Sequence, residues 1–223
     1  MNNDVFRHIH DLFLQYSNEE KAHQMSKYMK GKFSFYGIQS PIRREISRDI
    51  ITSLKPLPIS EIIDFIKILW SAEHRELQYL AMDIIDKRKG SLNASHLELG
   101  EYLVLNKTWW DTVDYLSTHF FAPILISLQV TERHAYILKL VEHPSMWMNR
   151  VAIIFQLMRK SETETELLEL SVIPHIASKE FFHQKAIGWA LRQYSKTNPL
   201  WVRDFIDVHD LAPLSKREAS KYL

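Results

Sequence analysis

The spacing of apolar residues constrains the fold of this chain more than any other feature. Apolar side chains recur every three or four residues along nearly the whole sequence, which is the period of one face of an α-helix. Only 5 glycines occur, and neither Asn-Gly nor Asp-Gly, the commonest hairpin turns, is present. We therefore expect an all-α fold. Helix starts are predicted at the capping candidates Ser17 (with Glu20), Ser40 (before Pro41), Ser60, Thr108, Ser145 and Ser178.

The predicted helices also repeat. Similar segments occur in LQYLAMDII near residue 80, WDTVDYL near 114, NRVAIIFQL near 150 and QKAIGWAL near 187. A step of about 35 residues fits a two-helix repeat, so we expect residues 1–223 to form one domain, a curved solenoid of antiparallel helical pairs with a concave binding face. One register makes Arg44, Tyr79, Asp114, Arg150 and Lys185 equivalent, with steps of 35, 35, 36 and 35 residues. We call these five positions the repeat column.

Composition narrows the functional classes. The chain has no cysteine, which excludes disulfides and thiolate metal sites, and its 11 histidines show no HExxH pairing, so we predict no metal. No apolar run is long enough to cross a bilayer and the N-terminus lacks a signal-peptide pattern, so we expect a cytoplasmic protein without a membrane partner. The net charge of +1 neither requires nor forbids nucleic acid, because phosphate binding needs only a local basic surface.

The segment KTWWDTVDYLSTH (107–119) combines two tryptophans with two aspartates. Thr108 and Asp111 have the spacing of a capping box, which would explain Asp111 by its backbone partners. Trp109 begins an apolar stripe and is expected in the core. That stripe continues through Val113, Leu116 and Phe120.

Trp110 and Asp114 share the adjoining face of the same predicted helix. They are four residues apart, so an aromatic ring and a carboxylate lie side by side. Taken alone, the pair fits a functional site and a half-exposed tryptophan beside a solvated acid equally well.

The later repeats favour the functional interpretation. Lys185, Trp189 and Arg192 share one helical stripe, and an aromatic ring between two cations suits a phosphate-bearing ligand. The alternative is a tryptophan covered by the stems of long basic side chains. Arg150 lies near the start of an apolar helix, so it needs an anionic partner such as Asp114 or a phosphate.

Several long motifs, in order, resemble the AlkD-type DNA alkylpurine glycosylases, a family built from HEAT-like repeats. The resemblance runs nearly end to end. It implies that Asp114 is the catalytic carboxylate, that Trp110 and Trp189 contact the sugar, that Arg150 is essential and that Tyr28 is the family's conserved tyrosine. The motifs are YMKGKFSFYGIQSPIRRE (28–45), KTWWDTVD (107–114), WMNRVAIIFQL (147–157), KEFFHQKAIGWALRQYSKTNP (179–199) and LAPLSKRE (211–218).

The resemblance further implies a reaction. The family removes N3- and N7-alkylated purines from double-stranded DNA without a metal or cofactor and leaves an abasic site. A cationic purine leaves as a neutral base, so this reaction needs no general acid and the residue types fit it. A carboxylate stabilises the oxocarbenium-like sugar. It either acts only electrostatically or also activates the attacking water. We expect a monomer. Candidate phosphate contacts are Arg44, Lys107, Arg150, Lys185, Arg192, Lys216 and Arg217, with Gln39 and Ser40 as neutral donors.

Two other functions remain compatible with such a sequence. A repeat protein with a basic groove can bind damaged or branched DNA after catalytic activity is lost. A helical solenoid can also serve as a protein-binding scaffold, which would show no salt-sensitive DNA binding.

Overall fold

The computed structural model of the chain describes residues 2–223, with the side chains from Asp4 onward. Most of this part of the chain is helical and no strand forms within it, although Ser34 and His74 make one isolated bridge. The prediction of an all-α fold of helical repeats is confirmed. The helices fall into two compact units, Met1–Leu92 and Asn93–Leu223. That the two act as one domain stays a prediction.

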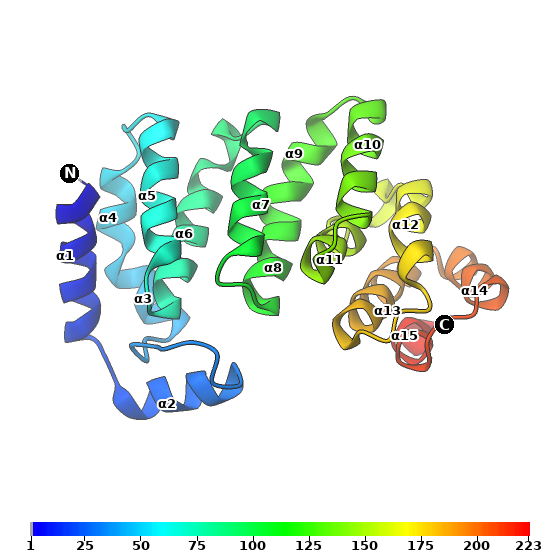
Figure 1. Ribbon diagram of the computed structural model, residues 1–223, viewed down its shortest axis with the longest axis horizontal. Helices are drawn as coiled ribbons and strands as arrows, with labels where there is room; N and C mark the ends of the chain where they lie inside the picture. Colours follow the sequence, from blue (N-terminus) through cyan, green and yellow to red (C-terminus); the bar gives the residue numbers. More distant parts are fainter. Residues whose placement is uncertain (1) are drawn as a thin grey trace. The chain divides into compact units, whose positions relative to one another are not determined.

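The first unit is organised around α5 and α6, which are joined by the short loop 72–74 and pack against each other. Its core includes the fully buried Phe13, Phe65 and Trp70. The helices of this unit are α1 (Asn2–Gln15), α2 (Glu19–Tyr28), α3 (Ser40–Ile46), α4 (Arg48–Ser53), α5 (Ile59–Ser71) and α6 (Arg75–Arg88), followed by a short turn at Lys89–Ser91 (Figure 1).

A buried carboxylate fixes the loop between α2 and α3. Glu76, at the start of α6, accepts hydrogen bonds from the backbone N–H groups of Tyr36, Gly37 and Ile38 at 3.1, 2.8 and 3.1 Å. Because a buried carboxylate is stable only when its oxygens have partners, this arrangement holds the loop against α6. The start of α3 is thereby set in place.

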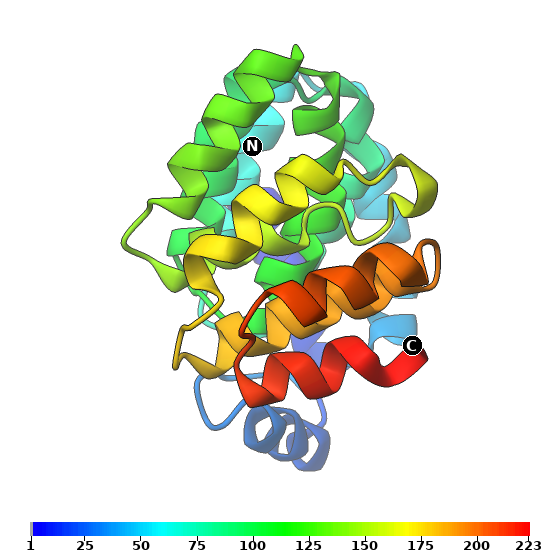
Figure 2. The same ribbon diagram turned by 90° about the vertical axis from the view of Figure 1, so that its right-hand side faces the viewer.

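The second unit is larger and ends in three neighbouring helices, α13, α14 and α15, which lie side by side in Figure 2. Its core includes Leu103, Phe120, Ile154 and Leu191, all fully buried. Its helices are α7 (Leu97–Leu105), α8 (Trp110–Leu116), α9 (Ala122–Ser127), α10 (Val130–Val141), α11 (Met146–Ile154), α12 (Thr165–Val172), α13 (Phe181–Ser195), α14 (Pro199–Val208) and α15 (Pro213–Ala219). Short helical turns cover Ala94–His96, Lys160–Glu162, Ile173–His175 and Ser220–Tyr222.

Helix α8 continues into α9 through one π-helical turn at Ser117–Phe121. Pro123 follows this turn, and a proline inside a helix cannot donate the usual backbone hydrogen bond, which favours a local change of winding. Helix α7 approaches the turn closely at Gly100, where a Cβ atom would come within 2.4 Å of the Phe120 ring. These contacts hold α8, which carries Asp114, against the core.

Side-chain amides support the proposed repeat register. Gln78, Asn149 and Gln184 each lie one residue before a position of the repeat column, and each donates to carbonyl groups of the segment that precedes its helix. Gln78 and Asn149 thus satisfy free carbonyls at the end of the preceding helix, and Gln184 makes the related bond to the loop just before its own helix. The acceptors are the carbonyls of Leu69, Trp70 and Ala72 for Gln78, of Leu140, Val141 and His143 for Asn149, and of Ser178 for Gln184.

Several predicted helix caps are wrong by one or two residues. The hydroxyls of Ser17 and Thr108 donate backwards, at 2.7 Å each, to the carbonyls of Leu14 and Val104, and so serve the preceding helix. The capping box of Thr108 with Asp111 therefore does not form, and Asp111 lies instead in the first turn of α8, where a helix dipole favours an acid. Of the six predicted caps, only Ser145 caps its helix as predicted. The observed caps are Asn18 instead of Ser17, Gln39 instead of Ser40, Pro58 instead of Ser60, Trp109 instead of Thr108 and Glu180 instead of Ser178.

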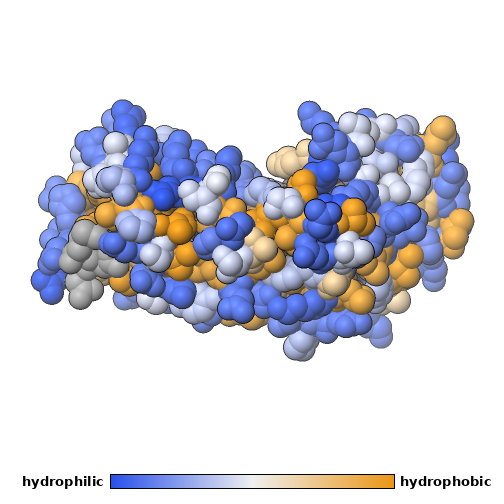
Figure 3. Space-filling view, turned by 90° about the horizontal axis from the view of Figure 1, so that it is seen from above, coloured by the Kyte–Doolittle hydropathy of each residue, from blue (hydrophilic) through white to orange (hydrophobic). Residues whose placement is uncertain are grey.

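The surface is mainly hydrophilic on the face seen in Figure 3, with apolar side chains scattered among polar ones. Large apolar residues that are well exposed include Phe181, Leu200 and Val208. Among the helices of residues 2–223, none combines the length and apolarity that a membrane crossing needs.

Candidate functional site

An ion pair between α8 and α11 forms the centre of the candidate site. The Nε and Nη2 atoms of Arg150 donate to the two carboxylate oxygens of Asp114 at 2.6 and 2.9 Å, and Nη1 donates to the carbonyl of Phe182 at 2.8 Å. The Arg150 side chain is 5% exposed and that of Asp114 18%. The prediction that Arg150 needs an anionic partner is confirmed, and the partner is Asp114.

The environment of Asp114 acts on its protonation in two directions. Burial raises the pKa of the carboxyl above its ordinary value, while the hydrogen bonds and charge of Arg150 oppose that rise. Two bonds from one rigid guanidinium also fix the orientation of the carboxylate. Because a carboxylate offers about four lone-pair sites, its exposed side can still accept a further hydrogen bond or face a cation.

Three aromatic rings gather beside this pair. The ring centroids of Trp109 and Trp147 are 5.7 Å apart, those of Trp109 and Phe182 5.3 Å, and those of Trp147 and Phe182 4.7 Å. The rings come from the N-terminal ends of three successive column helices, α8, α11 and α13. They pack around the residue whose carbonyl accepts from Arg150, and so stabilise the position of that carbonyl.

Trp147 and Phe182 were not among the residues singled out from the sequence. Each lies three residues before a column position, Arg150 and Lys185 respectively, which is one helical turn. A search of the column's neighbours for aromatic residues would have found both. Trp109, expected in the core, is half-buried within this aromatic cluster.

The two tryptophans singled out for sugar contact differ in their surroundings. Trp110 is the first residue of α8, half-buried, and precedes Asp114 by one turn, as the spacing predicted. Trp189 is half-buried on α13 and packs against the apolar core of the second unit. It follows Phe182 by seven residues, which places it roughly 10 Å further along the helix axis.

Three of the predicted phosphate-binding cations converge on one carboxylate that no sequence pattern singled out. Lys185, Arg192 and Arg217 lie 3.4, 2.7 and 3.9 Å from the oxygens of Glu218 on α15. Lys216, also on α15, is exposed. In α13 the two cations flank Trp189, so both interpretations of that tryptophan, ligand contact and cover by basic side chains, stay open.

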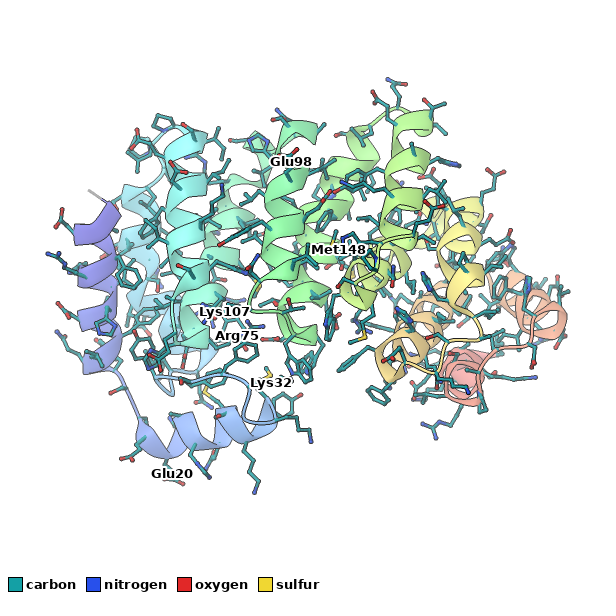
Figure 4. The ribbon with its side chains drawn as sticks, in the orientation of Figure 1. Glu20, Lys32, Arg75, Glu98, Lys107 and Met148 are labelled. Atoms are coloured by element: carbon teal, nitrogen blue, oxygen red, sulfur yellow. The ribbon has the colours of Figure 1, made fainter. Side chains whose placement is uncertain are left out.

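Lys107 lies in the loop between α7 and α8, where Figure 4 labels it. Its side chain is exposed and its φ angle is 50°, in the left-handed region that non-glycine residues rarely adopt. The loop joins directly to Trp109 and Trp110. Lys107 is therefore placed at the same end of α8 as the aromatic cluster.

The remaining candidates belong to the first unit. Tyr28 ends α2 and is 67% exposed. Gln39 and Ser40 are exposed at the start of α3, and the Arg44 side chain is 66% exposed, with Nε 3.4 Å from Asp83. Within residues 4–223, no three His, Asp or Glu side chains are grouped in a way that could hold a metal ion.

Comparisons with known proteins agree with each other. A family model described as DNA alkylation repair enzyme matches residues 9–223. A solved structure described as a predicted DNA alkylation repair enzyme from Enterococcus faecalis is 36% identical, with a TM-score of 0.86, over 93% of this chain and 96% of that one. No match was found among curated proteins. Sequence and structure thus lead to one family.

Proposed function

The chain belongs to the family of DNA alkylation repair enzymes, and from this premise we propose that it is a DNA glycosylase for purines alkylated at N3 or N7. Membership of the family supports a role in DNA repair. The observation that carries the finer proposal is the Asp114 carboxylate, which Arg150 holds by two hydrogen bonds and which remains 18% exposed. A fixed, accessible anion is what a reaction through a cationic sugar requires.

The proposed reaction balances without a cofactor. When the N-glycosidic bond breaks, its electron pair goes to the cationic purine, which leaves as a neutral base and needs no proton from the enzyme. Water adds to C1′ of the sugar, and its proton passes to Asp114 or to solvent. The products are the free base and an abasic site. The species to be stabilised is the oxocarbenium-like sugar.

Arg150 reduces the electrostatic contribution of Asp114 but does not cancel it. A sugar cation about 4 Å from the carboxylate gains about 4 kcal/mol at an effective dielectric near 20, and a guanidinium roughly 8 Å away on the far side offsets about 2 kcal/mol of this. The net effect, about 2 kcal/mol, is roughly thirtyfold in rate. In return, Arg150 opposes the rise in pKa that burial causes and orients the carboxylate.

The aromatic and basic residues have supporting roles in the proposal. Trp110, one turn before Asp114, offers a π face to the cationic sugar, which contributes about 0.5–2 kcal/mol depending on desolvation. We assign the same role toward the sugar to Trp189 on α13. The proposed contacts to the DNA backbone are Lys107, Lys185, Arg192, Lys216 and Arg217 in the second unit, and Tyr28, Gln39, Ser40 and Arg44 in the first.

A base-release assay tests the proposal. Duplex DNA methylated with a simple alkylating agent is incubated with the protein, and free 7-methylguanine and 3-methyladenine are measured by chromatography, with unmethylated DNA as the control. We expect release by the wild type only from methylated DNA. Binding of DNA without release would contradict the proposal and favour a non-catalytic DNA-binding protein. Absence of any salt-sensitive DNA binding would favour a protein-binding scaffold.

A further inference from the structure

Glu218 is a buried carboxylate surrounded by four cations. Its side chain is 6% exposed. Arg192 Nη1 and Lys221 Nζ lie 2.7 and 2.8 Å from Oε2, while Lys185 Nζ and Arg217 Nη2 lie 3.4 and 3.9 Å from Oε1. The hydrogen bond from Lys221 and, after it, the charge of Lys185 hold the pKa of Glu218 below its ordinary value against the opposing effect of burial, so the group is a carboxylate.

A close approach of two helices lets Glu218 reach both cations of α13. A Cβ atom on Gly188 of α13 would come within 2.5 Å of Glu218 Cβ and 3.0 Å of the carbonyl oxygen of Ser215, so only glycine fits there. Lys185 precedes Gly188 by three residues and Arg192 follows it by four, which places both on the face of α13 that meets α15. The Ser215 hydroxyl also donates to a carbonyl of α13 at 3.0 Å.

The cluster is negative inside and positive outside. Four cations around one carboxylate leave a surplus of three positive charges. The side chains of Lys185, Arg192, Arg217 and Lys221 are 38%, 25%, 72% and 47% exposed, against 6% for Glu218. One carboxylate also accepts far fewer hydrogen bonds than two lysines and two arginines can donate. Charge and donors therefore remain available toward solvent.

We propose that Glu218 is a positioning residue that assembles Lys185, Arg192 and Lys221 into a site for the phosphodiester backbone of DNA before DNA arrives. The proposal rests on the proposed function, since the anion it names is DNA. Without an anion among them, like charges repel each other, and each long side chain loses conformational entropy when a ligand orders it. Glu218 supplies that order in advance, which lowers the cost of binding.

Substitution of Glu218 by glutamine separates this proposal from simple electrostatics. Removal of a negative charge near DNA should tighten binding if only net charge matters. If Glu218 positions the cations, Glu218→Gln should instead weaken binding. Loss of one phosphate contact lowers the slope of log K against log salt by about 0.9 and weakens binding about eightfold at 0.1 M salt. The measurement is fluorescence anisotropy with a labelled undamaged duplex between 0.05 and about 0.3 M salt.

Two further variants control for charge and folding. Asp207→Asn, an exposed site on α14, makes the same charge change in the same unit and should leave affinity unchanged or slightly tighter. Glu218→Asp keeps the charge but shortens the side chain by one methylene, so weaker binding by this variant can come only from geometry. If glutamine at position 218 prevents folding, Glu218→Asp decides the question alone.

A double-mutant cycle with Arg192→Met measures the coupling between Arg192 and Glu218 in DNA binding, which a general structural role of Glu218 would not produce. Arg192→Met should weaken DNA binding severalfold in the wild type but much less in Glu218→Gln, because the arginine is no longer held in place there. Additive effects would overturn the proposal, as would tighter binding by Glu218→Gln. A wild type that binds DNA without releasing base would refute the glycosylase proposal and leave this one standing; a wild type that does not bind DNA would refute both.

Discussion

Replacement of Asp114 by asparagine tests both the chemistry and the ion pair. The substitution keeps the size of the side chain and one acceptor for Arg150, but removes the negative charge that balances a guanidinium only 5% exposed. Breaking a fully buried pair costs about 3–5 kcal/mol, and because Asp114 is 18% exposed we expect about 2–3 kcal/mol here. For a chain of this size that is a fall in Tm of roughly 4–12 °C.

The size of the rate loss distinguishes the two roles of the carboxylate. Loss of the electrostatic term alone should slow base release roughly thirtyfold. If Asp114 also accepts the proton of the attacking water, general-base catalysis contributes about another hundredfold or more, for a total above roughly a thousandfold. The assay is single-turnover release of 7-methylguanine, with protein in excess and at a temperature where the variant is folded.

The first unit provides a matched control in Asp83→Asn. Asp83 is 15% exposed and accepts from Nε and Nη2 of Arg43, a guanidinium 4% exposed, so it matches the Asp114 pair in burial and in the donor atoms. Both of these bonds go to Oδ2, while Oδ1 lies 3.4 Å from Nε of the exposed Arg44. We expect a similar fall in Tm but near wild-type base release. Equal loss of activity in both variants would show that the effect of Asp114→Asn comes from stability, and wild-type release by Asp114→Asn would refute the proposed mechanism.

Buried groups of the second unit give three further predictions. Burial raises the pKa of Asp114 and the ionised form is the active one, so on acidification single-turnover base release should begin to decline at a higher pH than an ordinary aspartate would give. This acidic limb should be absent in Asp114→Asn. Burial lowers the pKa of His183 from 6.5 to about 4. Between these two values the unfolded chain binds more protons than the folded one, so the free energy of unfolding should fall as the pH drops from 6.5 to about 4. Urea titrations should show a flatter pH dependence of this free energy for His183→Gln. Gly188→Ala should lower the free energy of unfolding by about 1–3 kcal/mol in thermal unfolding, since α15 leaves no room for a methyl group. In the control Gly90→Ala, no atom lies within 4 Å of the added Cβ, so the stability should be nearly unchanged. An unchanged Tm for Gly188→Ala would mean that α13 and α15 can separate easily.

The helix caps that were wrongly predicted have a common physical cause. A hydroxyl next to a helix boundary can cap the helix after it or satisfy a carbonyl of the helix before it, and spacing alone does not distinguish the two. Ser17 and Thr108 take the second course. The capping box that the sequence predicts for Asp111 therefore does not form, but the place of Asp111 in the first turn of α8 still suits an acid.

The sequence by itself determined the features that depend on periodicity and on charge. Apolar spacing specified helices, and the step of about 35 residues, 36 in this case, put Asp114 and Arg150 at equivalent positions of successive repeats. The cost of an unpaired buried cation required an anion beside Arg150. These properties are local or recur at a fixed interval, so one chain read in order is enough to find them.

Only the tertiary structure decided which groups meet across helices. Phe182 follows Arg150 by 32 residues and lies on another helix, α13. Its carbonyl accepts a hydrogen bond from Arg150, and its ring completes the aromatic cluster. Glu218 forms ion pairs with Lys185 and Arg192 because α15 can approach α13 at Gly188. Such partners depend on the distance between two packed backbones, which no pattern along a single chain encodes.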